Sequence, residues 1–191
     1  MNVFRDLVFI RKSSINMNYK GLLLVYSGDG KGKTTAALGM ALRAAGHGMK
    51  VLILQFMKCH EKIGEIKALT RTDLPITLKQ YGRRVFFRTR TCEIMDIHKA
   101  RQGLEAFKMA IKDNSYDMII LDEINMAIHF GLLEIEEVIE AVEQKPPELH
   151  LVLTGRNAKE KLIAMADLVS EIRDIKHHYH QGVQAQKGIE F

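Results

Sequence analysis

The sequence contains few cysteines and no long apolar segment. Only two of its 191 residues are cysteine, and Cys59 and Cys92 lie far apart and outside any CxxC pair, which excludes a disulfide framework and a regular zinc site. No run of roughly 18 uncharged apolar residues occurs, so no transmembrane helix is expected. Arg5 and Asp6 interrupt the apolar N-terminal stretch, and no small-residue cleavage site follows, which argues against a signal peptide. We therefore expect a cytoplasmic protein.

The composition is that of a globular chain, with 47% hydrophobic and 27% charged residues and no internal repeat. A chain of 191 residues is expected to form a single domain with one main site. The formal net charge of +5 favours anionic partners. It does not distinguish nucleotides from nucleic acid or from phosphorylated metabolites.

Short apolar runs alternate with helix-forming segments along the chain. Strands are predicted at residues 22–27, 51–56, 118–121 and 149–154, with a further candidate strand at 168–172. Helices are predicted at residues 34–45, around 100–111, around 135–142 and around 162–166. Residues 57–90 are interpreted as loops, because Pro75, several glycines and many charges break the periodicity, although residues 76–81 could form a strand. The alternation predicts an α/β domain with a mainly parallel sheet flanked by helices.

Ligands in such sheets bind beyond the carboxyl ends of the strands. The first candidate there is Ser27–Thr34, SGDGKGKT, which resembles a Walker A loop whose N–H groups surround phosphates. Lys33 is expected to contact the outer phosphates and Thr34 the magnesium ion. Ser27 stands where the full pattern has its first glycine. A flexible glycine turn is the alternative, but GKT between an apolar strand and a helix favours nucleotide binding.

The other strand-end candidates are acidic and basic. Asp122 and Glu123 follow an apolar strand, as in a Walker B element that holds hydrated magnesium; their alternative role is to cap the next helix. The phosphate loop upstream makes metal binding the preferred interpretation. Arg156, just past a strand, and Arg43, on the helix after the loop, could both reach a polyphosphate, although most arginines are simply solvated.

Three further patterns are weaker. His177, His178 and His180 fit no standard zinc spacing and are interpreted as a polar segment, and Cys59-His60-Glu61 is assigned no metal. Residues 83–90 mix arginines with Phe86 and Phe87, as nucleic-acid binders do. A solvated loop or a wall of a substrate pocket is the preferred interpretation, and no nucleic-acid or membrane partner is expected.

The stretch from Gly28 to Lys58 resembles the ATP:corrinoid adenosyltransferases, the cob(I)alamin adenosyltransferase family. Further matching segments follow in order and extend the resemblance over most of the chain from about residue 22. They are Gly64-Glu65, LDEI at 121–124, TGR at 154–156, ADLVSEIRDIK at 166–176, and Gly182-Val183, Ala185-Gln186 and GIEF at 188–191.

The resemblance implies a single-domain P-loop, RecA-like fold over residues 21–191, a homodimer, and transfer of the 5′-deoxyadenosyl group of ATP to the cobalt(I) of a corrinoid. ATP and Mg²⁺ or Mn²⁺ are the implied ligands, with Lys33, Thr34 and Glu123 catalytic. Thr34, Asp122 and Glu123 are implied to hold the metal. The implied nucleotide-binding residues are Gly28, Asp29, Gly30, Lys31, Gly32, Lys33, Thr34, Thr35, Arg43 and Arg156.

Cobalt(I) is a strong nucleophile, so the lack of an obvious catalytic base agrees with this chemistry. A flavin-dependent electron donor such as a flavodoxin is a further expectation from the family. Family members commonly carry an aromatic pair after a glycine matched here to Gly82, where this tryptophan-free sequence offers Phe86 and Phe87. Residues 1–20 are expected to cover the corrinoid pocket, in cis or in trans, or to pack as a short helix on their own subunit.

Two other functions stay open from the residues alone. In a P-loop ATPase, Glu123 would activate a water for attack on the γ-phosphate. A small-molecule kinase would need a base to position a substrate hydroxyl, and no such base is identified.

Overall fold

The computed structural model describes residues 20–59, 63–83 and 93–191. Their centre is a six-stranded sheet, parallel throughout, with strand order β3-β2-β4-β5-β1-β6. The strands are β1 (Leu23–Ser27), β2 (Val51–Phe56), β3 (Ile76–Tyr81), β4 (Met118–Asp122), β5 (His150–Thr154) and β6 (Leu168–Glu171). β1, β2, β4 and β5 confirm the sequence-based predictions to within one residue at each end, and β6 confirms the candidate strand at 168–172.

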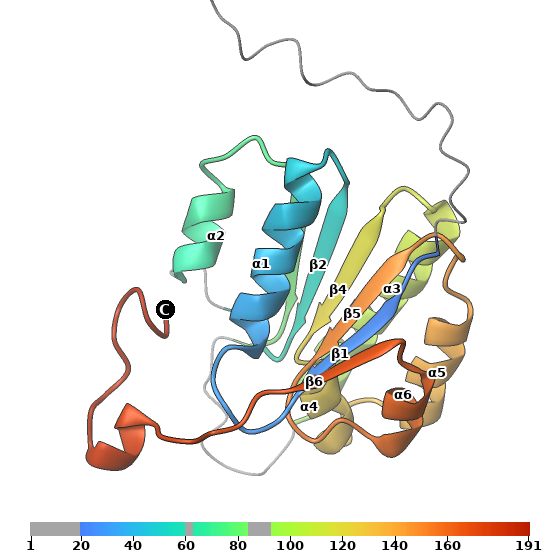
Figure 1. Ribbon diagram of the computed structural model, residues 1–191. Coiled ribbons are helices and arrows are strands. Elements are labelled where there is room, and N and C mark those ends of the chain that lie inside the picture. Colours follow the sequence, from blue (N-terminus) through green and yellow to red (C-terminus); the bar gives the residue numbers. More distant parts are fainter. Residues whose placement is uncertain (1–19, 60–62, 84–92) are drawn as a thin grey trace, which may run out of the picture.

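Helices cover both faces of the sheet, as a parallel sheet requires. They are α1 (Lys33–Gly46), α2 (Gly64–Leu69), α3 (Ile94–Asp113), α4 (Ile124–His129), α5 (Ile135–Glu143) and α6 (Glu160–Met165), with a 3₁₀ turn η1 (His178–Gln181). Figure 1 shows α1 in front of the sheet and α3 and α5 beyond it. The described residues thus form the three-layer α/β domain that the sequence predicts.

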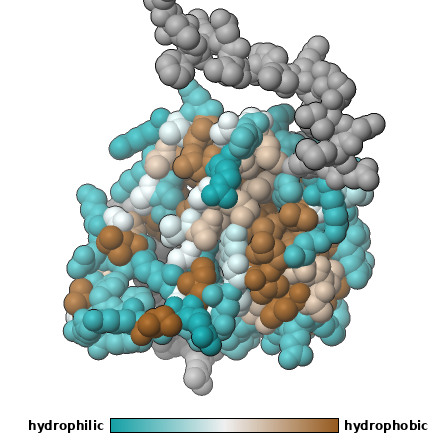
Figure 2. Space-filling model, in the orientation of Figure 1, coloured by the Kyte–Doolittle hydropathy of each residue, from teal (hydrophilic) through white to brown (hydrophobic). Residues whose placement is uncertain are grey.

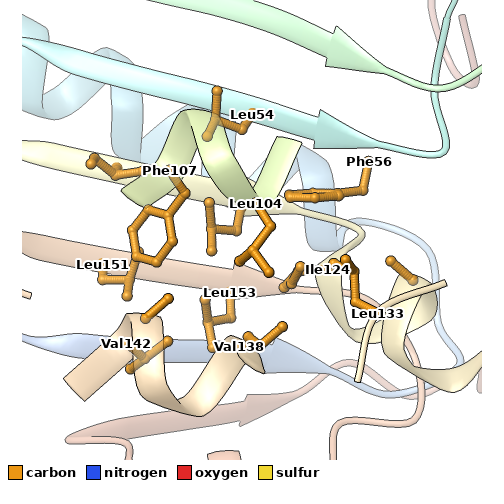
Figure 3. Close-up of a cluster of buried hydrophobic side chains, with 14 of the residues drawn as sticks. Leu54, Phe56, Leu104, Phe107, Ile124, Leu133, Val138, Val142, Leu151 and Leu153 are labelled. Carbon is orange, nitrogen blue, oxygen red and sulfur yellow. The ribbon is translucent and has the colours of Figure 1, made fainter. Parts of the chain in front are cut away.

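The alternation of side chains along each strand builds one core on each face of the sheet. On the α1 side, Ile53 and Ile120 pack against Ala37 and Ala41. On the opposite side, drawn in Figure 3, Leu54 and other strand residues meet α3 and α5. The labelled residues there are Leu54, Phe56, Leu104, Phe107, Ile124, Leu133, Val138, Val142, Leu151 and Leu153. Each large apolar side chain buried in this way contributes about 1.5–3 kcal/mol.

The strand order sets which loops meet. β5 lies between β1 and β4, and β2 lies on the other side of β4. The register pairs Tyr26 with Thr154 and Gln55 with Asp122. Because the strands are parallel, the carboxyl ends of β1, β5, β4 and β2 lie together at one end of the sheet. The N-terminus of α1 follows β1 at this same end.

The interpretation of residues 57–90 as loops is wrong for α2 and for β3, which occupies the segment 76–81 that could form a strand, and neither α4 nor η1 is predicted. α2 is only six residues long and none of them is buried, so the segment is too short for a periodic apolar pattern to mark it as a helix. Among the described residues, no helix is both long enough and apolar enough to span a bilayer.

The edge strand β6 and the neighbouring helix α6 carry exposed apolar side chains. Leu168 and Val169 of β6 and Ile163 of α6 are exposed, and Figure 2 shows hydrophobic surface gathered over this part of the molecule. β6 is short, as edge strands commonly are.

Candidate active site

The glycine-rich loop connects β1 to α1 with a fixed shape. Gly28 and Gly32 adopt φ values of 95° and 119°, which side-chain-bearing residues rarely adopt. The Gly30 N–H donates a 2.7 Å hydrogen bond to the carbonyl oxygen of Ile172. A Cβ added at Gly30 would lie 2.5 Å from the carbonyl oxygen of Arg173. The chain that leaves β6 therefore packs directly on the loop, and only glycine fits beneath it.

Lys33, the first residue of α1, lies inside the curve of this loop. Its Nζ donates hydrogen bonds of 2.7 Å to the Gly28 carbonyl and 2.5 Å to the Gly30 carbonyl. Only 8% of the residue is exposed, and this burial lowers the pKa of the ammonium group. The loop thus surrounds a cationic group at a helix N-terminus, the arrangement that favours anion binding.

Asp122 ends β4 at the centre of a hydrogen-bond cluster. Its Oδ1 accepts from the hydroxyls of Thr34 at 2.9 Å and Thr154 at 2.7 Å. Its Oδ2 accepts from Gln55 Nε2 at 3.0 Å and from Lys58 Nζ at 2.7 Å. Only 1% of Asp122 is exposed, so each of these donors compensates for water that the carboxylate has lost.

The charge state of Asp122 follows from these contacts. Burial alone would raise the pKa of this carboxyl, but the Lys58 ammonium and the hydrogen bonds from Lys58, Thr154 and Thr34 outweigh it. The pKa therefore lies below its ordinary value, and Asp122 is an anion. Gln80 continues the cluster, because its Nε2 donates a 2.9 Å hydrogen bond to Oε1 of Gln55.

Glu123 turns away from the strand in a left-handed conformation, with φ 63° and ψ 20°. Its backbone N–H donates a 3.0 Å hydrogen bond to the Thr154 hydroxyl, which fixes the turn into α4. Burial raises the pKa of the Glu123 carboxyl, and Lys58 offsets this only in part. The turn directs Glu123 into the cavity described next, while Asp122 stays behind it in the sheet.

A cavity of about 730 Å³ opens beside these residues. Its polar lining residues are Gly30, Lys31, Gly32, Lys33, Thr34, Thr35, Lys58, Gly64, Glu65, Glu123, Arg156, His177, Gly188 and Glu190. Its apolar lining residues are Leu38, Ile63, Met126, Ile189 and Phe191. A cavity that combines phosphate-binding groups with apolar side chains suits a nucleotide.

Residues 177–191, here called the C-terminal arm, provide one wall of this cavity. Figure 1 shows the chain beyond β6 running across the front of the domain to end beside α2. Glu190 anchors the arm: its Oε1 lies 3.6 Å from Lys31 Nζ and 3.2 Å from His178 Nε2. Its Oε2 accepts a 2.6 Å hydrogen bond from the backbone N–H of Gln186. The arm is thereby tied to the phosphate loop.

Most residues predicted from the sequence meet at this cavity. Arg156 and Glu123 line it together with Gly30–Thr35. Asp29 lies beside it, with its carboxylate 3.9 Å from Nε of Arg156. Arg43 is placed differently, because it lies exposed in the last turn of α1 and is not among the residues that line the cavity.

Four contributions were not predicted as part of the site: Gln55, Lys58, Thr154 and the C-terminal arm. Gln55 carried a usable signal, because a polar residue inside the apolar run VLILQF needs a buried partner. Lys58 and Thr154 lie within segments that carry the family resemblance, but their contacts depend on neighbouring strands. The arm also contains segments of the family resemblance, but nothing in them indicates its place at the cavity.

The structure describes part of the three weaker sequence patterns, the histidines at 177–180, residues 59–61 and residues 83–90. The rings of His177 and His178 lie 4.6 Å apart, yet no group of three or more His, Cys, Asp or Glu side chains in the described part of the chain could hold a metal ion. Arg83 is engaged by Asp96 at 2.6 and 2.7 Å and by Glu93 at 2.6 Å. The predictions for Phe86, Phe87, His60, Glu61 and residues 1–19 lie outside the described residues.

Comparison with known proteins decides the family. The family model described as ATP:corrinoid adenosyltransferase BtuR/CobO/CobP matches residues 19–191. The chain belongs to the ATP:corrinoid adenosyltransferase family. The cavity lies wholly within the part of the chain that this match covers.

Individual relatives in this family are similar over most of their length. A corrinoid adenosyltransferase of Sinorhizobium sp. is 40% identical over 174 residues, which are 90% of this chain and 81% of the relative. One of Pseudomonas aeruginosa is 37% identical, over 90% of this chain and 84% of the relative. The corrinoid adenosyltransferase CobA of Salmonella typhimurium is 35% identical, over 90% and 86% respectively.

Proposed function

We propose that this chain transfers the 5′-deoxyadenosyl group of ATP to the cobalt(I) of a corrinoid and releases triphosphate, in adenosylcobalamin biosynthesis or salvage. The observation that carries the proposal is the single cavity where Lys33, Glu123 and Arg156 meet, in a chain that matches this family over residues 19–191. The reaction is balanced without an added proton acceptor. The electron pair of cobalt(I) forms the Co–C5′ bond, and the pair of the C5′–O bond leaves with the triphosphate.

The residues of the loop act on the leaving group. The Lys33 ammonium and the N–H groups at the start of α1 stabilise the charge that grows on the triphosphate as the C5′–O bond breaks. Arg156 adds a guanidinium, whose planar donors suit phosphate oxygens. Arg43 would contribute only if a bound triphosphate or a neighbouring subunit reached the last turn of α1.

A divalent metal, Mg²⁺ or Mn²⁺, fits the oxygen atoms at the loop. Thr34 and Asp122 are linked by a 2.9 Å hydrogen bond, and Glu123 follows directly. Mg²⁺ prefers oxygen ligands and usually binds one or two carboxylates together with substrate phosphates. Thr34, Asp122 and Glu123 would hold the ion, which when bound supplies positive charge to the triphosphate oxygens.

The apolar lining residues of the cavity are assigned to the adenosine. They are Leu38, Ile63 and Met126, together with Ile189 and Phe191 of the C-terminal arm. Packing of the base there would hold the ribose C5′ in one position toward the incoming corrinoid, which lowers the entropy cost of reaction. The corrinoid is proposed to enter beside this wall.

Two partners complete the proposal. A homodimer is supported by the exposed apolar side chains of β6 and α6, since such surface commonly marks a protein interface. A flavin-dependent donor such as a flavodoxin would reduce the corrinoid to cobalt(I), a state that calls for a reducing compartment such as the cytoplasm. Light scattering during size-exclusion chromatography tests the dimer, and a subunit mass of 21.8 kDa at all concentrations would reject it.

Product analysis tests the reaction. The full chain is incubated with ATP, Mg²⁺ and chemically reduced cob(I)alamin without oxygen. We expect inorganic triphosphate and a light-sensitive adenosylcorrinoid in equal amounts, and very slow use of ATP when the corrinoid is omitted. Rapid formation of ADP and phosphate with no adenosylcorrinoid would replace the proposal with a P-loop ATPase.

A further inference from the structure

Lys58 places a positive charge among the oxygens assigned above to a metal. It follows β2, and its Nζ lies 2.7 Å from Oδ2 of Asp122 and 2.9 Å from the Thr34 hydroxyl. The same nitrogen lies 4.0 Å from Oε1 of Glu123. One ammonium group thus contacts or approaches all three side chains of the proposed metal site.

The contacts are not incidental surface pairing. Asp122 is almost fully buried, and removal of the cation paired with a buried carboxylate is strongly unfavourable. In the described residues, the ammonium of Lys58 is the cation within 4.0 Å of both Asp122 and Glu123. An ammonium and a divalent ion at this cluster would repel each other strongly, because like charges a few ångströms apart in a partly buried site are poorly screened.

The lysine can also leave the cluster. Its side chain is 23% exposed and lines the nucleotide cavity. A lysine has a flexible four-carbon stem, so its ammonium can turn toward an anion in the cavity while the backbone stays fixed. A bound triphosphate would supply such an anion.

We propose that Lys58 is a resident counter-cation that keeps divalent metal out of the Thr34–Asp122–Glu123 cluster until a nucleoside triphosphate binds. This inference rests on the proposed metal site. In the free protein the ammonium neutralises Asp122, and metal alone binds weakly. When a triphosphate draws the ammonium into the cavity, the carboxylates need a new cation, so metal and nucleotide bind together. Lys58 is a positioning residue in this scheme.

Binding of Mn²⁺ alone, without nucleotide, tests the inference. The electron paramagnetic resonance signal of free Mn²⁺ is followed during titration of the full-length wild-type protein, Lys58→Met and Lys58→Arg. We expect Lys58→Met to bind Mn²⁺ at least about tenfold more tightly than the wild type, because the competing charge is gone. Lys58→Arg keeps the charge and is expected to resemble the wild type. Lys161→Met, which removes a lysine from an exposed pair with Glu136, is the matched control and should not change Mn²⁺ binding.

Thermal unfolding gives a second readout that does not depend on turnover. Lys58→Met should unfold at a lower temperature than the wild type, since Asp122 has lost its cation, and Mn²⁺ should restore much of the loss. If Lys58→Met does not fold, Lys58→Gln serves instead, because its amide can still donate to Asp122. The wild type should respond little to Mn²⁺ unless ATP is added.

Two results would overturn the inference. Equal Mn²⁺ affinity in the wild type and in the uncharged variants would show that Lys58 does not compete with metal. Tight binding that survives in Lys58→Met/Glu123→Gln would place the metal elsewhere. A failure of the adenosyl transfer reaction is a separate outcome, because it appears in product analysis and leaves these affinities unchanged.

Discussion

The Thr154 hydroxyl connects the two acidic residues of the site: it donates a 2.7 Å hydrogen bond to Asp122 and accepts a 3.0 Å hydrogen bond from the backbone N–H of Glu123. Thr154 can do this because β5 lies between the phosphate-loop strand β1 and the acidic strand β4. β5 therefore fixes both the buried carboxylate of Asp122 and the turn that presents Glu123 to the cavity.

Replacement of Thr154 by valine keeps the shape of the side chain and removes both hydrogen bonds. We expect the free energy of unfolding to fall by about 1–3 kcal/mol, because a buried N–H loses its acceptor and a buried carboxylate loses a donor. Urea unfolding measures this. Thr77→Val on the exposed side of β3 makes the same chemical change and should have little effect. Equal stability of Thr154→Val and the wild type would contradict the structural role.

Replacement of Lys33 by methionine should weaken ATP binding at least about tenfold, since the ammonium is the cation enclosed by the phosphate loop. The domain should still fold, because Lys33 contacts loop carbonyls and not the apolar core. Isothermal titration with ATP measures the affinity, and circular dichroism checks the fold. Lys108→Met, on the surface of α3, is the control. Normal ATP affinity in Lys33→Met would remove the loop from the nucleotide site.

His150 predicts a pH-dependent part of the stability. Its Nδ1 accepts a 3.1 Å hydrogen bond from the Leu22 N–H, and burial, assisted by Lys145, lowers its pKa below the ordinary 6.5. The neutral ring is therefore favoured in the folded state. The contribution of the neutral His150 ring to the free energy of unfolding is fully present above pH 6.5. This contribution is lost as the pH falls through the lowered pKa of His150.

The stability difference between the wild type and His150→Gln should accordingly be larger at neutral pH than in acid. We expect about 0.5–1.5 kcal/mol at neutral pH, the usual net value of one hydrogen bond. Urea unfolding across this pH range provides the measurement. His47→Gln, at an exposed position after α1, corrects for general effects of removing a histidine. A difference that stays constant with pH would reject the assignment.

Replacement of Glu190 by alanine should loosen the C-terminal arm, because it removes the contacts with Lys31, His178 and Gln186. We expect trypsin to cleave after Lys176, where the arm begins, and after Lys187 within it about threefold faster, because local opening becomes easier. Mass spectrometry of the fragments over time gives the rates. Glu143→Ala, at the end of α5, is the control and should be cleaved at the wild-type rate. Equal cleavage rates for Glu190→Ala and Glu143→Ala would mean that Glu190 does not hold the arm.

The sequence predicted those parts of the structure that local patterns determine. An apolar run followed by GKT is enough to predict β1, the phosphate loop and α1, and the pair Asp122-Glu123 is recognisable at its strand end. Lys58 illustrates the limit. Its role exists only because β2 pairs with β4 and brings Gln55 beside Asp122, a long-range register that local periodicity does not encode.

The same limit applies to α2 and to the arm. α2 has only six residues, so it is too short for a repeating apolar pattern to mark it as a helix. The arm contacts Lys31 through Glu190, two residues separated by most of the chain. The family resemblance included the end of the arm but not its place at the cavity.

The hydrogen bond from Gly30 to Ile172 limits the number of backbone donors that the loop can offer to an anion. The Gly30 amide donates to the chain leaving β6, so in this conformation it is not available to a phosphate. A shift of that outgoing segment would release one more donor and alter the curvature of the turn. The number of hydrogen bonds available to the triphosphate is therefore set at the outermost strand of the sheet, well away from the acidic residues.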